Sequence, residues 1–315
     1  MDGNGFGAGT GAGTDDGPGT VVVRDVAMRD GLQIEEPIST RAKLELLDAI
    51  VATGVREVEV TAFVSPTKVP ALADAAEIAT HLDRFADTVD FSALVASVTG
   101  AHRALDAGLR NLEYVVSASD AHSRANVGRG SDDSATLIDE IVSAAHESDG
   151  RVEVIVATAW DCPFDGPTPP ERVESVIARA VAAGADRISI ADTIGTTTPR
   201  RVTELIERVR PLLDGRPLGA HFHNTRGTGL ASAYAAVQAG VRRLDASAGG
   251  LGGCPFAPGA SGNIATEDLV YLLRDSGTDT GIDLPTAIAA GRVAVALTGG
   301  GAGSALMRAG DRLLS

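Results

Sequence analysis

Cysteine is almost absent from this chain, since Cys162 and Cys254 are the only two among 315 residues and lie far apart. Two cysteines without metal-ligand spacing suggest neither a disulfide framework nor a zinc finger. No apolar run approaches the roughly 18 to 20 residues that a membrane-spanning helix needs. The N-terminal segment also lacks the basic start and apolar core of a secretory signal. We therefore expect a cytoplasmic protein with free thiols and no contact with a membrane.

Aromatic residues and positive charge are also scarce. Phe, Trp and Tyr make up 3% of the residues, and the formal net charge is −15. Such a chain repels a polyphosphate backbone and offers few side chains on which bases can stack, so we exclude nucleic acid as a partner. An anionic substrate must then be bound by local arginines, a metal ion or helix N-termini.

The first twenty residues are mostly Gly, Thr and Asp and contain too little apolar surface to offset the entropy of ordering them. We expect residues 1–20 to form a disordered tail and residues 21–315 to form a single catalytic domain. The 44% hydrophobic content is sufficient for one large core.

Short runs rich in β-branched residues alternate with longer helical patterns after residue 20. The eight runs are 20–28, 56–63, 89–96, 111–118, 151–159, 186–192, 218–224 and 242–250. The helical segment after the first run opens at Ser39 or Thr40 and ends at Gly54, and two later segments begin near Pro170 and Pro199. Eight strand–helix units predict an α/β fold, a (β/α)8 TIM barrel, with extra C-terminal helices near 266–275, 285–297 and 302–314.

Strand two tests this interpretation through its alternation. In an extended strand Glu57, Glu59, Thr61 and Phe63 share one face, and the valines between them share the other. The valine face suits contact with outer helices, and the polar face then points into the barrel. An inward Glu59 needs a cation beside it, because an unpaired buried carboxylate costs several kcal/mol or becomes protonated.

Polar residues recur at the carboxyl ends of the strands, where such barrels carry their chemistry. They are Arg29, Asp30, Glu59, Thr61, Ser117, Ser119, Asp192, His221 and His223. His221 and His223 point the same way in an extended strand, so two imidazoles and the Asp30 carboxylate form a ligand set for a divalent cation. Asn263, at the end of the glycine-rich run 248–263, would add an amide oxygen. These ligand types leave the identity of the metal open.

Five motifs give the chain a resemblance to a known family. They are MRDGLQIE (28–35), EVEVTAFVSPTKVP (57–70), ISIADTIGTTTP (188–199), HFHNTRG (221–227) and GGLGGCPFAPGASGNIATEDLVYLL (249–273). Together they resemble the 3-hydroxy-3-methylglutaryl-CoA lyase family of the DRE-TIM metallolyases, which have a pyruvate carboxyltransferase-like domain. The resemblance extends from about residue 21 to residue 275.

The resemblance implies a role for each matching residue. The metal ligands would be Asp30, His221, His223 and Asn263, and the ion would be Mg²⁺ or Mn²⁺. Arg29 would stabilise enolate charge on the thioester oxygen, with Glu59 holding it in place. Asp192, His221 and Cys254 match positions implicated in catalysis. We assign Gln33 and Arg226 to binding of an acyl-CoA thioester substrate, and we expect a homodimer or higher homo-oligomer.

The implied reaction is a retro-aldol-type cleavage that releases acetoacetate and acetyl-CoA. Asp30 or His221 would take the hydroxyl proton, and Cys254 or His221 would protonate the enolate carbon. Three departures from the family pattern leave the exact thioester open: Arg226 stands in place of Tyr, Asn224 in place of Asp, and Thr67-Lys68 in place of Lys-Trp. The alternatives are an acyl-CoA/α-keto acid condensing enzyme or aldolase of the same superfamily, and a non-catalytic metal-binding paralogue.

Each site residue also has a purely structural interpretation. Arg29 and Glu59 would be a simple ion pair, and Asp192 would cap the turn into the next helix. We interpret Cys162 as a packed thiol, whereas Cys254 lies on a glycine loop from which it could approach a substrate. The four remaining histidines are expected on helical or loop surfaces: His81, His102, His122 and His146.

Overall fold

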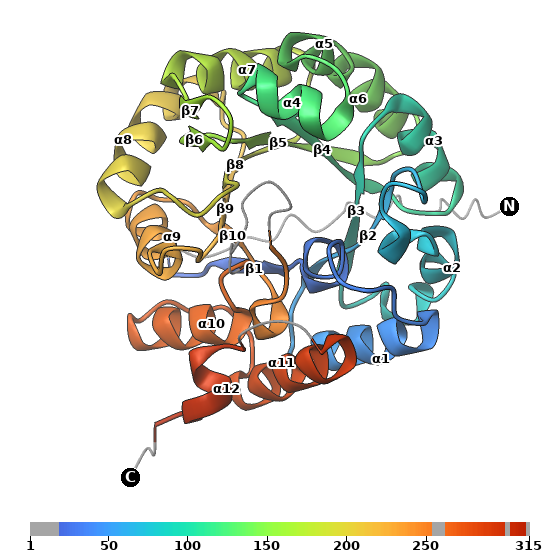
Figure 1. Ribbon diagram of the computed structural model, residues 1–315, viewed down its shortest axis with the longest axis vertical. Coiled ribbons are helices and arrows are strands. Elements are labelled where there is room, and N and C mark those ends of the chain that lie inside the picture. Colours follow the sequence, from blue (N-terminus) through green and yellow to red (C-terminus); the bar gives the residue numbers. More distant parts are fainter. Residues whose placement is uncertain (1–18, 254–261, 300–302, 313–315) are drawn as a thin grey trace, which may run out of the picture.

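The computed structural model describes residues 19–253, 262–299 and 303–312. Its eight parallel strands close into a barrel in the order β1-β10-β9-β8-β5-β4-β3-β2 (Figure 1). The strands are β1 (Val22–Asp25), β2 (Glu57–Phe63), β3 (Asp90–Val95), β4 (Asn111–Ser117), β5 (Arg151–Ala157), β8 (Arg187–Asp192), β9 (Leu218–Phe222) and β10 (Arg243–Ala246). A short antiparallel hairpin, β6 (Asp161–Cys162) and β7 (Gly166–Pro167), follows β5. All eight predicted runs contain a barrel strand, so the predicted fold is confirmed.

Helices surround the barrel (Figure 1). They are α1 (Thr40–Val51), α2 (Ala75–Ala79), α3 (Val98–Asp106), α4 (Asp120–Val127), α5 (Ser131–Thr136), α6 (Ile138–His146), α7 (Pro170–Ala182), α8 (Pro199–Val209) and α9 (Gly229–Gln238). Ser39 is the N-cap of α1, where its hydroxyl accepts a hydrogen bond from the Ala42 amide at 3.2 Å. Pro170 and Pro199 occupy the first positions of α7 and α8, as their fixed φ angle favours.

Three further helices, α10 (Thr266–Asp275), α11 (Leu284–Thr298) and α12 (Ala305–Ala309), lie outside the barrel beside β1 (Figure 1). Helix α11 packs against both α1 and α10. Helix α12 is shorter than the predicted segment 302–314. Residues 1–18 of the expected tail lie outside the described residues, while Thr20 forms a parallel bridge with Asp279. No helix in the described ranges is long and apolar enough to span a membrane.

The prediction for strand β2 is correct in its first half only. The pairing of β2 with β3 shifts register between Glu59 and Thr61, so the simple alternation stops there. Phe63 was expected to share the inward face with Glu59. Its ring instead lies 5.7 Å from the guanidinium carbon of Arg103 on the outer helix α3. One extra residue in the strand therefore turns the Phe63 side chain towards the helices.

The barrel interior is charged where many such barrels hold layers of Val, Ile and Leu. Arg24 of β1 reaches Glu153 of β5 at 2.9 Å, although these two strands lie opposite each other in the closed order. This bond must therefore cross the interior. Buried charges are tolerated only when they are paired. In this interior the paired side chains come from different strands. The expected cation beside Glu59 is Arg29, whose Nε lies 2.6 Å from a Glu59 oxygen.

Candidate metal centre and active site

A short π-helical turn at the end of β1 positions the first two site residues. The turn spans Ala27–Gly31 and buries both Arg29 and Asp30. A π-helical turn is rare and occurs frequently at functional sites. Strand β1 itself ends at Asp25, earlier than the apolar run 20–28 implied. The turn therefore places Arg29 and Asp30, which are adjacent in sequence, at the carboxyl end of the barrel.

Three predicted metal ligands converge there. The ligand atoms of Asp30, His221 and His223 lie within 4.8 Å of one another, and all three residues are buried. His223 Nε2 is 3.5 Å and His221 Nε2 is 4.0 Å from Asp30 Oδ2. The two imidazole centroids are 5.0 Å apart, as expected for positions i and i+2 of a strand.

Asn263 joins these ligands through its backbone as well as its side chain. Residues 262–264 run beside the end of β9, where Asn263 forms an antiparallel bridge with His223. The Asn263 amide nitrogen donates to Asp30 Oδ2 at 2.7 Å and to the Leu251 carbonyl at 3.0 Å. Its Oδ1 is buried and has no hydrogen-bond partner among the described residues. An unpaired buried acceptor beside a carboxylate and two imidazoles fits a divalent cation as its missing partner.

The charges around Asp30 keep it ionised. Burial alone would raise the pKa of Asp30, but the Arg29 guanidinium and the two histidines outweigh burial and hold the pKa well below its usual range. For His221, burial lowers the pKa, and the hydrogen bond and charge of Asp245 more than offset this and raise it. An ionised carboxylate is the form that binds a cation.

Asp245 of β10 was missed by the analysis of the sequence, and it orients His221. His221 Nδ1 lies 3.1 Å from Asp245 Oδ2, and both groups are buried. A carboxylate at this position requires the proton on Nδ1, which leaves the Nε2 lone pair directed at the metal centre. The alternation used for strand two, applied to the run RRLDASAGG, would have found an inward Asp245.

Arg29 forms the second part of the site. It is buried, and in addition to its contact with Glu59 its Nη1 donates to Asp30 Oδ1 at 2.7 Å. The carboxylates of Glu59 and Asp30 hold the pKa of Arg29 above its usual value despite its burial. Gln33 donates to the same Asp30 oxygen at 2.6 Å. Gln33, predicted to bind substrate, therefore contacts a metal ligand.

Asp192 and Arg226 both contact the loop between β8 and α8. Each carboxylate oxygen of Asp192 accepts a backbone N–H, from Thr196 and from Thr197, at 3.0 Å. Burial raises the pKa of Asp192, partly offset by these two bonds. Arg226 is exposed and donates to the carbonyls of Ile194 and Gly195 at 3.0 and 3.1 Å. The capping interpretation of Asp192 thus has a structural basis, and its catalytic role stays a prediction.

Two further predictions concern the cysteines and one histidine. Cys254 lies outside the described residues, so its role also stays a prediction. Cys162 is buried, and its sulfur accepts from the Ser119 hydroxyl at 3.0 Å, which agrees with a packed thiol.

The expectation of a surface position for His122 is wrong. His122 is buried in α4, where its Nδ1 lies 3.1 Å from the Ser117 hydroxyl and burial lowers its pKa to about 4.

The fold and these residues define a (β/α)8 barrel with a candidate divalent-metal centre at its mouth. The chain belongs to the HMGL-like family, whose model matches residues 20–294. It is 42% identical over 265 residues to a hydroxymethylglutaryl-CoA lyase of Pseudomonas mevalonii, covering 84% of this chain and 88% of the relative. It is 40% identical over 280 residues to an (R)-citramalyl-CoA lyase of Chloroflexus aurantiacus, covering 86% and 88%.

The fold agrees with solved structures of this family. An HMG-CoA lyase from Acinetobacter baumannii, in complex with coenzyme A and 3-methylmalate, superposes with a TM-score of 0.89 at 38% identity. The alignment covers 95% of this chain and 98% of that one.

Proposed function

We propose that this protein is a divalent-metal-dependent carbon–carbon lyase that cleaves 3-hydroxy-3-methylglutaryl-CoA to acetoacetate and acetyl-CoA. The observation that carries the proposal is the convergence of Asp30, His221 and His223 beside the Arg29–Glu59 ion pair. The relatives from Pseudomonas mevalonii and Acinetobacter baumannii are both named for this activity, and they support it.

The bond changes in this reaction define what the site must do. The substrate is a tertiary alcohol whose hydroxyl is β to a thioester carbonyl. Removal of the hydroxyl proton lets the carbon–carbon bond break, and the electron pair passes to the α-carbon to give a ketone and a thioester enolate. The enolate carbon then takes a proton to give acetyl-CoA. When bound by Asp30, His221, His223 and Asn263, Mg²⁺ or Mn²⁺ supplies Lewis acidity that lowers the pKa of the hydroxyl.

Arg29 suits stabilisation of the enolate. Its Nε lies 2.6 Å from Glu59, its Nη1 donates to Asp30, and no hydrogen bond among the described residues uses its Nη2. A guanidinium paired with two buried carboxylates has little freedom to move, so it can face a developing negative charge without reorganising. Removing one preorganised donor of this kind typically lowers the rate by about 10² to 10³. Glu59 is then a positioning residue for Arg29.

The proton transfers involve the remaining candidates. Asp30 and His221 belong to the proposed ligand set and are also the candidate bases for the hydroxyl proton. The acid that protonates the enolate carbon is Cys254 or His221. Alkylation by a thiol reagent, with protection by substrate, separates these two choices, because Cys162 is buried and Cys254 is the only other thiol.

A second substrate is supported by the Chloroflexus relative, which is named for cleavage of (R)-citramalyl-CoA. That thioester lacks one methylene between the tertiary carbon and the free carboxylate, and its ketone product is pyruvate. One methylene in a binding pocket discriminates by about 1–3 kcal/mol, or roughly 10- to 200-fold. The same catalytic groups would serve both substrates.

The test is a comparison of kcat/KM for the two thioesters, with acetoacetate and pyruvate measured by coupled assays in the presence of Mg²⁺ or Mn²⁺. We expect cleavage of 3-hydroxy-3-methylglutaryl-CoA to be preferred by at least tenfold. Preference for citramalyl-CoA would reassign the substrate. The absence of cleavage of either thioester by metal-loaded protein would refute the proposal in favour of a condensing enzyme or a non-catalytic paralogue.

A further inference from the structure

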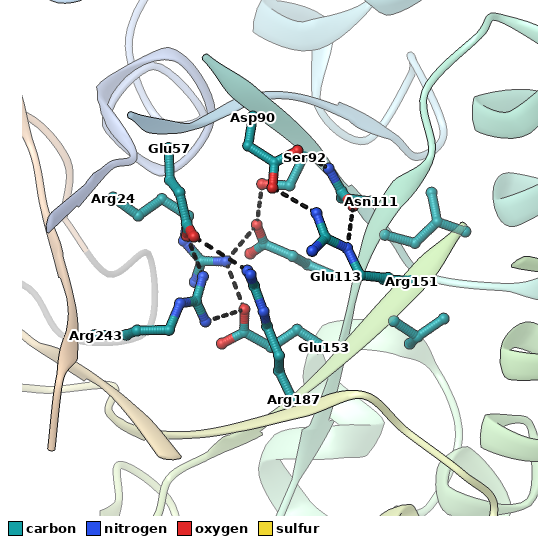
Figure 2. A pocket seen from close by; sticks show the side chains of 12 residues that line it. Arg24, Glu57, Asp90, Ser92, Asn111, Glu113, Arg151, Glu153, Arg187 and Arg243 are labelled. Atoms are coloured by element: carbon teal, nitrogen blue, oxygen red, sulfur yellow. Dashed lines mark hydrogen bonds and ion pairs between the residues drawn. The ribbon is translucent and has the colours of Figure 1, made fainter. Parts of the chain in front are cut away.

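Arg24 lies in the barrel interior below the metal centre and connects the two walls of the barrel. It is 3% exposed. Its Nη1 contacts Glu113 of β4 at 2.6 Å and Glu153 of β5 at 2.9 Å. Figure 2 shows this guanidinium between Glu113, Glu153 and Arg243. On its other side, Arg24 Nε and Nη2 donate to the two oxygens of Asp245, each at 2.9 Å.

This arrangement continues from Asp245 to the metal centre. Asp245 Oδ2 accepts from Arg24 Nη2 and also lies 3.1 Å from His221 Nδ1. The register of the sheet gives the same order, because Arg24 pairs with Asp245 across β1 and β10, and Asp245 pairs with His221 across β10 and β9. Three neighbouring strands therefore contribute one residue each to a continuous chain of buried polar contacts.

The geometry restricts His221 more than a single hydrogen bond would. A carboxylate that accepts one bond from an imidazole can still rotate about its own side-chain torsions. The bidentate fork of Arg24 fixes both oxygens of Asp245 in one plane. The third guanidinium nitrogen, Nη1, contacts Glu113 and Glu153 on the opposite wall of the barrel. The orientation of His221 is thus fixed by contacts that reach both sides of the barrel.

We propose that Arg24 is a positioning residue for the metal centre, which acts by holding Asp245 and through it His221. The inference rests on the metal site of the proposed function and adds a residue to it. Outer-sphere partners of metal-binding histidines typically change metal affinity or activity 10- to 100-fold when they are mutated. The competing interpretation is that Arg24 only neutralises Glu113 and Glu153, in which case metal affinity does not depend on the shape of its side chain.

Arg24→Lys is the informative substitution, because it keeps the positive charge and removes the planar fork. Arg243→Lys is the matched control. Arg243 is also an arginine of the interior, with 12% of its side chain exposed, and pairs with Glu57 and Glu153, so it belongs to the same charge network (Figure 2). Both variants should lose thermal stability to a similar extent.

The readout is the affinity for Mn²⁺, measured by calorimetry and by the electron paramagnetic resonance signal of free Mn²⁺. We expect Arg24→Lys to weaken Mn²⁺ binding by about 10- to 100-fold and Arg243→Lys to change it by less than threefold. We also expect Arg24→Lys to lower kcat at saturating Mn²⁺ while the KM for the thioester changes little. If the role of Arg24 is purely structural, Arg24→Lys and Arg243→Lys should change Mn²⁺ affinity and kcat equally.

A double-mutant cycle tests the route. If Arg24 acts through Asp245, Arg24→Lys should weaken Mn²⁺ binding much less in an Asp245→Asn background than in the wild type. Additive effects, or wild-type Mn²⁺ affinity in Arg24→Lys, would overturn the inference. Should Arg24→Lys fail to fold, the paired variant Arg24→Gln with Glu113→Gln removes one charge of each sign and takes its place. Failure of the wild-type protein to bind Mn²⁺ would instead refute the metal site of the proposed function.

Discussion

His223 is the residue whose removal most directly tests the metal centre. Its Nε2 faces Asp30, and among the described residues its Nδ1 has no hydrogen-bond partner, so the proposed metal ion would be the main polar partner of this imidazole. We expect His223→Ala to lose Mn²⁺ binding by more than about 100-fold, since a direct ligand matters at least as much as an outer-sphere partner, while circular dichroism keeps the barrel signature. His102→Ala, an exposed histidine on α3, is the control. Full activity of His223→Ala would contradict the assigned ligand set.

Substitution of Arg226 distinguishes a role in substrate binding from a role in stabilising the β8–α8 loop. Its guanidinium contacts two carbonyls of the β8–α8 loop, close to the turn capped by Asp192. If it also holds a substrate carboxylate, Arg226→Ala should lower kcat/KM at least tenfold, or about 1.4 kcal/mol, with unchanged metal content. Arg226→Lys should restore little, because bidentate geometry is lost. Arg200→Ala removes an exposed i,i+4 ion pair on α8 and should leave kinetics unchanged. Wild-type kinetics in both Arg226 variants would assign Arg226 to the loop alone.

At the scale of elements, alternation predicted the strands and the barrel but not the exact direction of every side chain. The eight runs were recognisable because β-branched residues repeat between helical segments. The bulge in β2 had no comparable signal because it is defined by the pairing with β3. The π-helical turn after β1 had none because its closing bond, from the Gly31 N–H to the Val26 carbonyl, joins backbone groups that the residue types do not reveal. Asp30, His221 and His223 were predicted together since the sequence pattern placed each at or just after the carboxyl end of a strand. Alternation alone would place Arg24 and Asp245 on the inward face, but only the register shows that they lie level with His221, so their role was missed.

Gly252, in the glycine-rich segment before Asn263, lies so close to two site residues that its substitution gives a testable prediction. Gly252 has φ +112°, and a Cβ there would lie 2.6 Å from the Asn263 amide nitrogen and 3.2 Å from the Asp30 carbonyl oxygen. We expect Gly252→Ala to displace Asn263 and weaken Mn²⁺ binding at least tenfold, in the range of outer-sphere changes. Gly108→Ala is a matched control, because Gly108 has φ +95° and no atom within 4 Å of its added Cβ. It carries a similar backbone strain of about 1–3 kcal/mol without the clash. Equal Mn²⁺ affinity in the two variants would remove the steric explanation.

For the whole molecule, buried carboxylates influence stability in opposite directions as pH changes. Burial raises the pKa of Glu153, but Arg24 and Arg243 outweigh it and lower the pKa to about 2. Because this value lies below that of the unfolded chain, its stabilising contribution is present above about pH 4 and is lost as pH falls towards 2. Burial raises the pKa of Asp25 to about 6, so its contribution is present at low pH and is lost as pH rises through 6.

Glu267 extends the second effect to neutral pH and provides a direct test. It is fully buried in α10, where one oxygen accepts from the Gly249 amide at 3.2 Å and the other lies against Gly291 of α11. Burial raises its pKa from 4.5 to about 7. Between these values the folded protein binds more protons than the unfolded chain, so stability must fall as pH rises. Each pKa unit corresponds to about 1.4 kcal/mol, which gives a loss of up to about 3 kcal/mol between pH 4.5 and pH 8.

Glu267→Gln should remove this loss, because the amide keeps an acceptor for the Gly249 N–H and cannot ionise. We expect the free energy of unfolding of the variant, measured in urea, to decline less between pH 5 and pH 8 than that of the wild type. The difference should reach about 1–3 kcal/mol. Glu207→Gln, an exposed glutamate on α8, should follow the wild-type curve. Parallel curves for Glu267→Gln and the wild type would show that Glu267 is ionised and compensated in the folded protein, and that the packing of α10 against α11 accommodates its charge.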